Sequence, residues 1–158
     1  MACKYSDRIA RLILGVIEDA HLVHYLPWQF AACAVSGRDS VMVADWTIKY
    51  GYGGNTRTIT VPRGFRFGVG TNKIPGFAMR ALRFVVNLQH KQRSSAVHDL
   101  LYTTRGGERK DETLDDGTPI VVDADPPITR AEADAVAYAL DIADGIAKWE
   151  AVVGWLFL

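Results

Sequence analysis

Apolar residues recur at every third or fourth position between residues 8 and 20, and charged residues occupy the other sides. This is the spacing of an amphipathic α-helix. We expect that helix to run on to about Tyr25 and to end before Pro27, because proline cannot continue a helix. The pattern therefore predicts a helical arm at the N-terminal side of the chain.

Short runs of β-prone residues follow the predicted arm. Residues 41–50 and 56–61 flank a glycine-rich stretch, which predicts a hairpin with a glycine turn. Residues 64–75 carry glycines among apolar residues, and we expect a bent strand or an ordered loop there. This part of the chain is thus predicted to form a small antiparallel sheet.

Helical spacing returns in the second half of the chain. Residues 77–88 are expected to be helical, and so are residues 96 to about 104, after a cap at Ser94 or Ser95. Gly106 and Gly107 follow directly and should end that second helix, because glycine is common just past a helix C-terminus.

The C-terminal part begins with a capping box, in which Thr129 and Glu132 can each accept the other's backbone amide hydrogen. It predicts a helix from residue 129 to about residue 143 that breaks near Gly145. The apolar stretch at residues 146–158 must then be buried in the core, in a partner or in an assembly.

The composition is that of an ordinary globular domain. Of 158 residues, 49% are hydrophobic, and 18 basic residues balance 18 acidic ones. Without a basic surplus we expect no nucleic-acid partner. Cys3 and Cys33 are too few for a disulfide scaffold or a four-thiolate zinc site. The longest apolar runs fall short of a membrane span or signal-peptide core, so we expect a soluble chain with no membrane span.

Candidate chemistry centres on the run His98-Asp99-Leu100-Leu101-Tyr102 in the helix predicted at residues 96–104. Residues four apart share a helix face, so His98 and Tyr102 align, and Asp134 on a neighbouring helix could face the imidazole. In one interpretation His98 is the general base of a hydrolase, Asp134 orients it, and Asp99 or Tyr102 supports a metal or the substrate. The alternative, which we favour, is a buried polar pair that ties two helices together.

The same run, His-Asp-x-x-Tyr, resembles the catalytic helix of secreted phospholipases of the A2 type. That resemblance covers only these residues. The phospholipase pattern also has disulfide-bonded cysteines and a calcium loop, whereas serine, alanine, valine and leucine flank His98 here.

A longer series of motifs runs from about residue 45 to residue 154. In order, it reads Trp46-x-Ile48, Ile59-Thr60-Val61-Pro62-x-Gly64-Phe65, Lys73-Ile74-Pro75, Ala96-Val97-His98-Asp99-Leu100-Leu101-Tyr102, Arg130-x-x-Ala133-Asp134 and Gly154. This series is similar to a family of tailed-bacteriophage proteins known as a domain of unknown function. Because members of that family occur in phage and prophage genomes, the resemblance implies a phage-encoded protein and leaves its activity open.

The chain departs from the family pattern in two respects. The family usually reads Thr-Asp-x-Ala-Ser-x-Pro after Gly-Phe, whereas residues 67–75 contain no aspartate. If that aspartate belongs to a metal or acid/base site, the site is incomplete here. The N-terminal segment and an acidic segment between Tyr102 and Thr129 are additions, which an assembly subunit would use to reach its neighbours.

The sequence gives weaker support for the other candidate sites. Four aspartates of the acidic segment could gather calcium but lack the spacing of an EF-hand, so we favour a solvated loop with one short strand; they are Asp115, Asp116, Asp123 and Asp125. His21 and His24 would need further metal ligands that the sequence does not identify. The glycines at residues 51–54 lack the lysine and hydroxyl residue of a phosphate-binding loop. No cofactor is therefore expected, and metal binding stays open.

Together these patterns predict an α+β fold, in which a small antiparallel sheet at residues 41–69 packs against three or four helices. Residues 1–40 would form the helical arm, and residues 41–158 the phage-family domain with an acidic surface insertion at about residues 106–127.

The favoured function is a structural component of a tailed phage virion, in the tail, baseplate or neck. It would lie in the virion, and in the host cytoplasm during assembly, with other virion proteins and copies of itself as partners. The alternative is a phage hydrolase that acts on the host envelope. A third possibility is a small phage protein that inhibits a host factor through its acidic loop.

Overall fold

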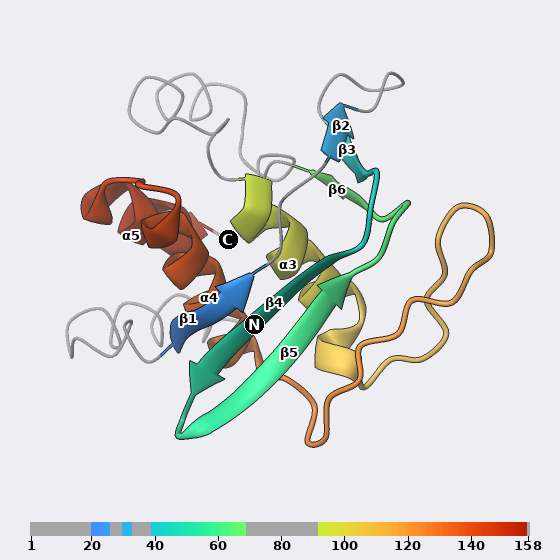
Figure 1. The fold of residues 1–158 in the computed structure, drawn as a ribbon, viewed down its shortest axis with the longest axis horizontal. Coiled ribbons are helices and arrows are strands. Elements are labelled where there is room, and N and C mark those ends of the chain that lie inside the picture. Colours follow the sequence, from blue (N-terminus) through green and yellow to red (C-terminus); the bar gives the residue numbers. More distant parts are fainter. Residues whose placement is uncertain (1–19, 26–29, 33–38, 69–91, 158) are drawn as a thin grey trace.

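A computed structural model describes residues 20–25, 30–32, 39–68 and 92–157. Within these residues the chain forms two small antiparallel sheets and three α-helices (Figure 1). The predicted α+β class is confirmed. Of the helix expected at residues 8–20, only Ala20 is described, and the helix expected at residues 77–88 lies wholly outside the described residues.

The first sheet has the strand order β1-β4-β5. β4 (Trp46–Tyr52) and β5 (Asn55–Val61) are the predicted hairpin, with Trp46 opposite Val61 and Ile48 opposite Ile59. Gly53 and Gly54 form its turn with φ angles of 56° and 81°, which glycine adopts without strain.

β1 (Ala20–Tyr25) pairs with the other edge of β4. The expected continuation of the N-terminal helix to about Tyr25 is therefore wrong. Ala20 and Leu22 pack against the core, whereas His21 and Val23 are exposed, which is the two-residue period of a half-buried strand. β1 thus precedes the boundary expected near residue 40 and still belongs to the sheet that follows it.

The second sheet has the order β2-β3-β6, formed by β2 (Phe30–Ala32), β3 (Asp39–Met42) and β6 (Arg66–Gly68). The single sheet predicted at residues 41–69 is therefore two sheets, because the chain bends at residues 43–45 between β3 and β4. β6 is part of the bent strand expected at residues 64–75.

The first described helix, α3 (Gln92–Thr103), starts earlier than the sequence predicted. Ser94 and Ser95 are buried helical residues and not caps, because packing extends the helix over positions whose local preference is neutral. A short 3₁₀ helix, η3 (Arg105–Gly107), follows, and its glycines end the helical region as expected.

The two C-terminal helices agree with the sequence. α4 (Arg130–Ala143) begins after Thr129, whose Oγ1 accepts the amide hydrogen of Glu132 at 3.2 Å. Gly145, with φ 77°, separates α4 from α5 (Lys148–Phe157). On α5, Ala151 is buried but Trp149 is 54% exposed, so the chain's own core does not cover all of the apolar stretch.

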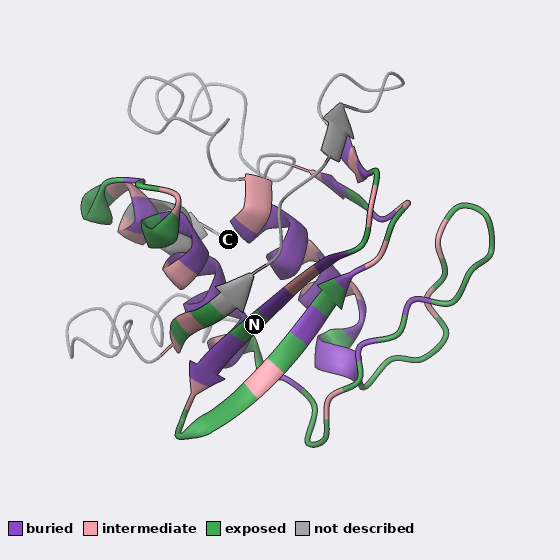
Figure 2. Ribbon diagram, viewed as in Figure 1, coloured by how far each residue is buried: buried purple, intermediate pink, exposed green. Residues whose placement is uncertain are grey.

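The core lies between the first sheet and the helices, where Figure 2 shows buried positions along β4, α3 and α4. The acidic segment adds Ile120 and Val122 to this core, while Val121 between them is exposed. The strand expected in this segment does not form; residues 108–127 carry an isolated bridge between Thr113 and Pro119. The rest of the segment loops out to one side of the molecule (Figure 1).

Candidate functional site

Helices α3 and α4 pack against each other and bring the four predicted site residues together. His98, Asp99 and Tyr102 come from α3, and Asp134 comes from the first half of α4. The helical spacing had predicted that His98 and Tyr102 align, and their rings stack with centroids 4.0 Å apart. The predicted approach of Asp134 to the imidazole is present as well.

His98 lies between two carboxylates and is only 5% exposed. Its Nε2 is 3.5 Å from Oδ1 of Asp134, and its Nδ1 is 3.7 Å from Oδ1 of Asp99. These are ion-pair distances. Neither ring nitrogen makes a hydrogen bond to the part of the chain that the structure describes. Each nitrogen of the imidazole therefore lies close to a different carboxylate.

The two carboxylates are held by further contacts. Asp134 accepts a hydrogen bond from the hydroxyl of Tyr102 at 2.8 Å, and Asp99 accepts one from the backbone amide of Gly68 at 3.0 Å. Asp99 thus links α3 to β6, and Asp134 links α3 to α4. We call His98, Asp99, Tyr102 and Asp134 the His98 cluster.

The charge of the imidazole follows from these surroundings. Burial disfavours the charged form of His98, but the adjacent carboxylates of Asp134 and Asp99 outweigh it and raise the pKa of His98 above its ordinary value of 6.5. A general base must be neutral and must face the proton that it removes. A protonated imidazole between two carboxylates is suited to an ion-pair contact between helices.

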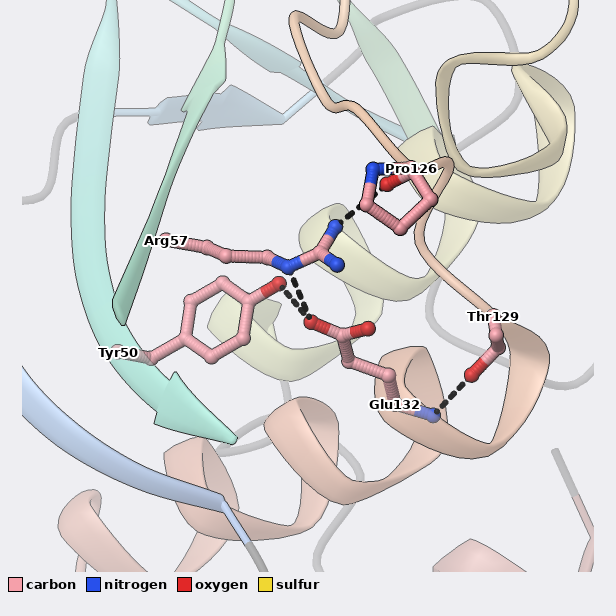
Figure 3. A network of polar contacts seen from close by, with 5 residues as sticks. All are labelled: Tyr50, Arg57, Pro126, Thr129 and Glu132. Carbon is pink, nitrogen blue, oxygen red and sulfur yellow. Dashed lines mark hydrogen bonds and ion pairs between the residues drawn. The ribbon is translucent and has the colours of Figure 1, made fainter. Parts of the chain in front are cut away.

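A second buried network, which the sequence did not reveal, joins α4 to the first sheet (Figure 3). Glu132 is 3% exposed, and its Oε1 accepts a hydrogen bond from the Tyr50 hydroxyl at 2.9 Å and contacts Nε of Arg57 at 3.2 Å. Arg57 also donates to the carbonyl of Pro126 at 2.7 Å. We call Tyr50, Arg57 and Glu132 the Glu132 network.

The Glu132 network corrects half of the predicted capping box. Thr129 accepts the amide of Glu132 as expected, but the carboxylate of Glu132 points to the sheet (Figure 3). Burial and the neighbouring carboxylate of Glu132 raise the pKa of Tyr50 far above its ordinary value, so its hydroxyl stays a donor. The sequence near Glu132 gives no sign of this network apart from Glu132 itself, because its partners Tyr50 and Arg57 lie more than 70 residues earlier.

The weaker metal candidates do not gather. The ring of His21 lies directly over Gly51, where it fills the space of an absent Cβ, and the side chain of His24 is outside the described residues. Asp115 pairs with Arg66 at 2.5 Å, and Asp116 accepts the amide of Thr118 at 2.9 Å. Among the described residues, no three histidine, cysteine or acidic side chains form a group that could hold a metal.

None of the described helices is both long enough and apolar enough to cross a membrane. Comparisons with protein-family models, curated proteins and solved structures found no match to this chain. The resemblance to the tailed-phage family is therefore carried by the motifs in the sequence alone, and it stays a prediction.

Proposed function

We propose that this protein is a structural component of a tailed phage virion that acts by assembly with other virion proteins and with copies of itself. The observation that carries the proposal is apolar surface on the C-terminal helices. Trp149 on α5 is 54% exposed and Ile142 on α4 is 41% exposed. A large exposed apolar patch is typical of an interaction surface.

The surface around Ile142 is also hollowed. A pocket of about 570 Å³ lies between β1, α4 and α5, and most of its lining is apolar, including Leu22, Ile142 and Ile146. An apolar hollow of this kind can receive side chains from a neighbouring subunit. We define the apolar face as the surface formed by β1, α4 and α5 around this pocket, together with Trp149, which directly follows the lining residue Lys148 on α5.

The geometry of His98 supports the structural interpretation over the hydrolase alternative. A catalytic base keeps one ring nitrogen for its orienting carboxylate and the other for water or substrate. In the His98 cluster each nitrogen faces a carboxylate at 3.5 or 3.7 Å, and the ring is buried. This arrangement supports a contact that holds α3, α4 and β6 together.

The test of the virion proposal is peptide mass spectrometry on density-purified particles of the encoding phage, with copy number measured against the major capsid protein. We expect the protein at a fixed ratio that corresponds to a symmetric ring. Its absence from purified particles would overturn the proposal.

The hydrolase alternative has a test of its own in His98→Ala. A structural cluster predicts a loss of about 3 kcal/mol in unfolding free energy, because Asp134 stays buried without its cationic partner. A catalytic base predicts instead that hydrolysis of envelope lipids or peptidoglycan is lost while the melting temperature stays within a few degrees of wild type. Urea unfolding and hydrolysis assays on the same preparation separate the two results.

A further inference from the structure

A second pocket, of about 410 Å³, lies where η3 meets the start of α4. Its walls include Tyr102, Arg105, Gly106, Ile128 and Arg130, all within the described residues. This volume lies within the range of about 300–1,000 Å³ that is usual for small-molecule sites. The pocket is separate from the apolar face, which is built from β1, α4 and α5.

The walls of this pocket are fixed by backbone contacts. The amide of Ile128 donates to the carbonyl of Gly106 at 2.9 Å, so the turn after α3 is bonded to the segment that leads into α4. The two backbones are so close that a Cβ on Gly106 would lie 1.9 Å from the Ile128 carbonyl oxygen. The pocket is therefore preformed, which lowers the entropic cost of binding.

Two arginines give the pocket its charge. Within the described residues, four arginines pair with carboxylates, namely Arg57, Arg66, Arg93 and Arg109. Arg105 and Arg130 have no carboxylate at ion-pair distance in that part of the chain, and both line the pocket. The guanidinium of Arg130 lies over the ring of Tyr102, 5.4 Å from its centroid, which orients it. Glu108 is the only acidic residue among the described lining residues.

We infer that this pocket binds a small organic anion, in which a phosphate or carboxylate group is attached to an apolar body. Guanidinium groups form paired hydrogen bonds with the oxygens of both kinds of group. The apolar body would lie against the apolar part of the lining, which includes Leu101, Pro127 and Ile128. The two arginines leave a net positive charge beside Glu108, so a neutral ligand would leave both guanidiniums without an ionic partner.

The backbone of Arg105 provides a variant that removes charge without harming the fold. Its φ angle is 50°, in the left-handed region that glycine adopts more easily than any other residue. Arg105→Gly should therefore unfold at the same temperature as wild type or at a higher one. Arg130→Gln removes the second charge and keeps a side chain of similar length.

The experiment is a calorimetric or NMR titration of the full chain with phenyl phosphate, benzoate and inorganic phosphate. We expect saturable binding of phenyl phosphate or benzoate by wild type, and at least tenfold weaker binding by Arg105→Gly and by Arg130→Gln. Arg63→Gln is the matched control, because Arg63 is exposed and lies outside the pocket. This variant should bind the probes as tightly as wild type does.

The relative affinities of the probes identify the anion. Tighter binding of phenyl phosphate indicates a phosphorylated ligand, and tighter binding of benzoate indicates a carboxylate. Inorganic phosphate that binds as tightly as phenyl phosphate would contradict the role of the apolar body. The proposal is overturned if wild type binds none of the probes at millimolar concentration, or if the Arg105 and Arg130 variants bind like the Arg63 control.

Discussion

His98 makes the stability of the fold depend on pH. The carboxylates of Asp134 and Asp99 raise its folded-state pKa above the ordinary 6.5. A group whose pKa is raised by folding stabilises the folded state fully below its unfolded pKa, and this stabilisation is lost as the pH rises through the folded pKa. We therefore expect the unfolding free energy of wild type, measured by urea unfolding, to fall as the pH rises above about 6.5.

His98→Gln removes the titrating group and should flatten the pH dependence over this range. The control is Val121→Ala, at a 63% exposed position on the acidic segment, which removes no titratable group and should keep the slope of wild type. An NMR titration of His98 gives an independent readout. A midpoint for His98 below 6.5, or equal slopes in wild type and His98→Gln, would contradict the ion-pair assignment.

Arg57 compensates a buried charge, and its removal should therefore cost more than the removal of an exposed arginine. In Arg57→Met, Oε1 of Glu132 keeps only its hydrogen bond from the Tyr50 hydroxyl. We expect this variant to lose about 2–3 kcal/mol in unfolding free energy. Arg63→Met, at an exposed position just after β5, should change it by less than about 0.5 kcal/mol. Urea unfolding measures both.

A double variant shows whether Arg57→Met loses stability because the Glu132 carboxylate stays buried without its cation or because packing is lost. Arg57→Met combined with Glu132→Leu removes both charges, so it should be more stable than Arg57→Met alone. If the two losses simply add, the Glu132 carboxylate does not depend on Arg57 for compensation, and the interpretation is wrong.

The two buried clusters differ in how far the sequence predicts them. The His98 cluster could be predicted because three of its members share one helical run and the fourth lies on the next predicted helix. The Glu132 network could not be predicted, because Tyr50 and Glu132 are 82 residues apart. The local sequence explains Tyr50 as a strand residue and Glu132 as part of a capping box, without any contact between them. The structure adds what spacing cannot give, namely that both ring nitrogens of His98 face a carboxylate.

Among the secondary structure elements, η3 depends on Gly106 for its close contact with the segment before α4. Gly106→Ala adds left-handed strain at φ 67° and a clash with the Ile128 carbonyl, so the backbones must separate. Gly117→Ala has similar strain at φ 82° but no atom within 4 Å of its Cβ. The strain costs about 1–2 kcal/mol in either variant, and the clash should cost Gly106→Ala about 2 kcal/mol more in urea unfolding. Equal losses would show that the turn adapts without cost.

The elements that the sequence predicted correctly are those with strong local signals. The hairpin has two glycines at its turn, and α4 has Thr129 at its cap. β1 is different, because its six residues continue a helical pattern, and its conformation is decided by pairing with β4, whose partner residues lie 23 to 32 positions later in the chain. The division into two sheets likewise depends on a bend at residues 43–45 that carries neither glycine nor proline.

At the scale of the whole molecule, the sequence predicted that the apolar C-terminal stretch needs a cover but not which part would stay exposed. Ala151 and Trp149 are two residues apart on α5, yet one is fully buried and the other is 54% exposed. Residues two apart lie on roughly opposite sides of a helix, and the packing of α5 on α4 covers the side that carries Ala151. Which part of the C-terminal stretch stays exposed therefore depends on the tertiary structure. That exposed part is the surface that our proposal assigns to contacts with other subunits.

Our proposal that copies of the chain associate through the apolar face predicts that thermal stability depends on protein concentration, because association stabilises the folded chain by mass action. We expect the melting temperature of wild type to rise by about 5 °C over a hundredfold increase in concentration. Trp149→Glu should abolish the rise, since a buried unpaired carboxylate opposes association. Val121→Asp, at a 63% exposed position on the acidic segment, should keep it. A rise in all three chains would place the interface elsewhere, and no rise in wild type would argue against self-assembly.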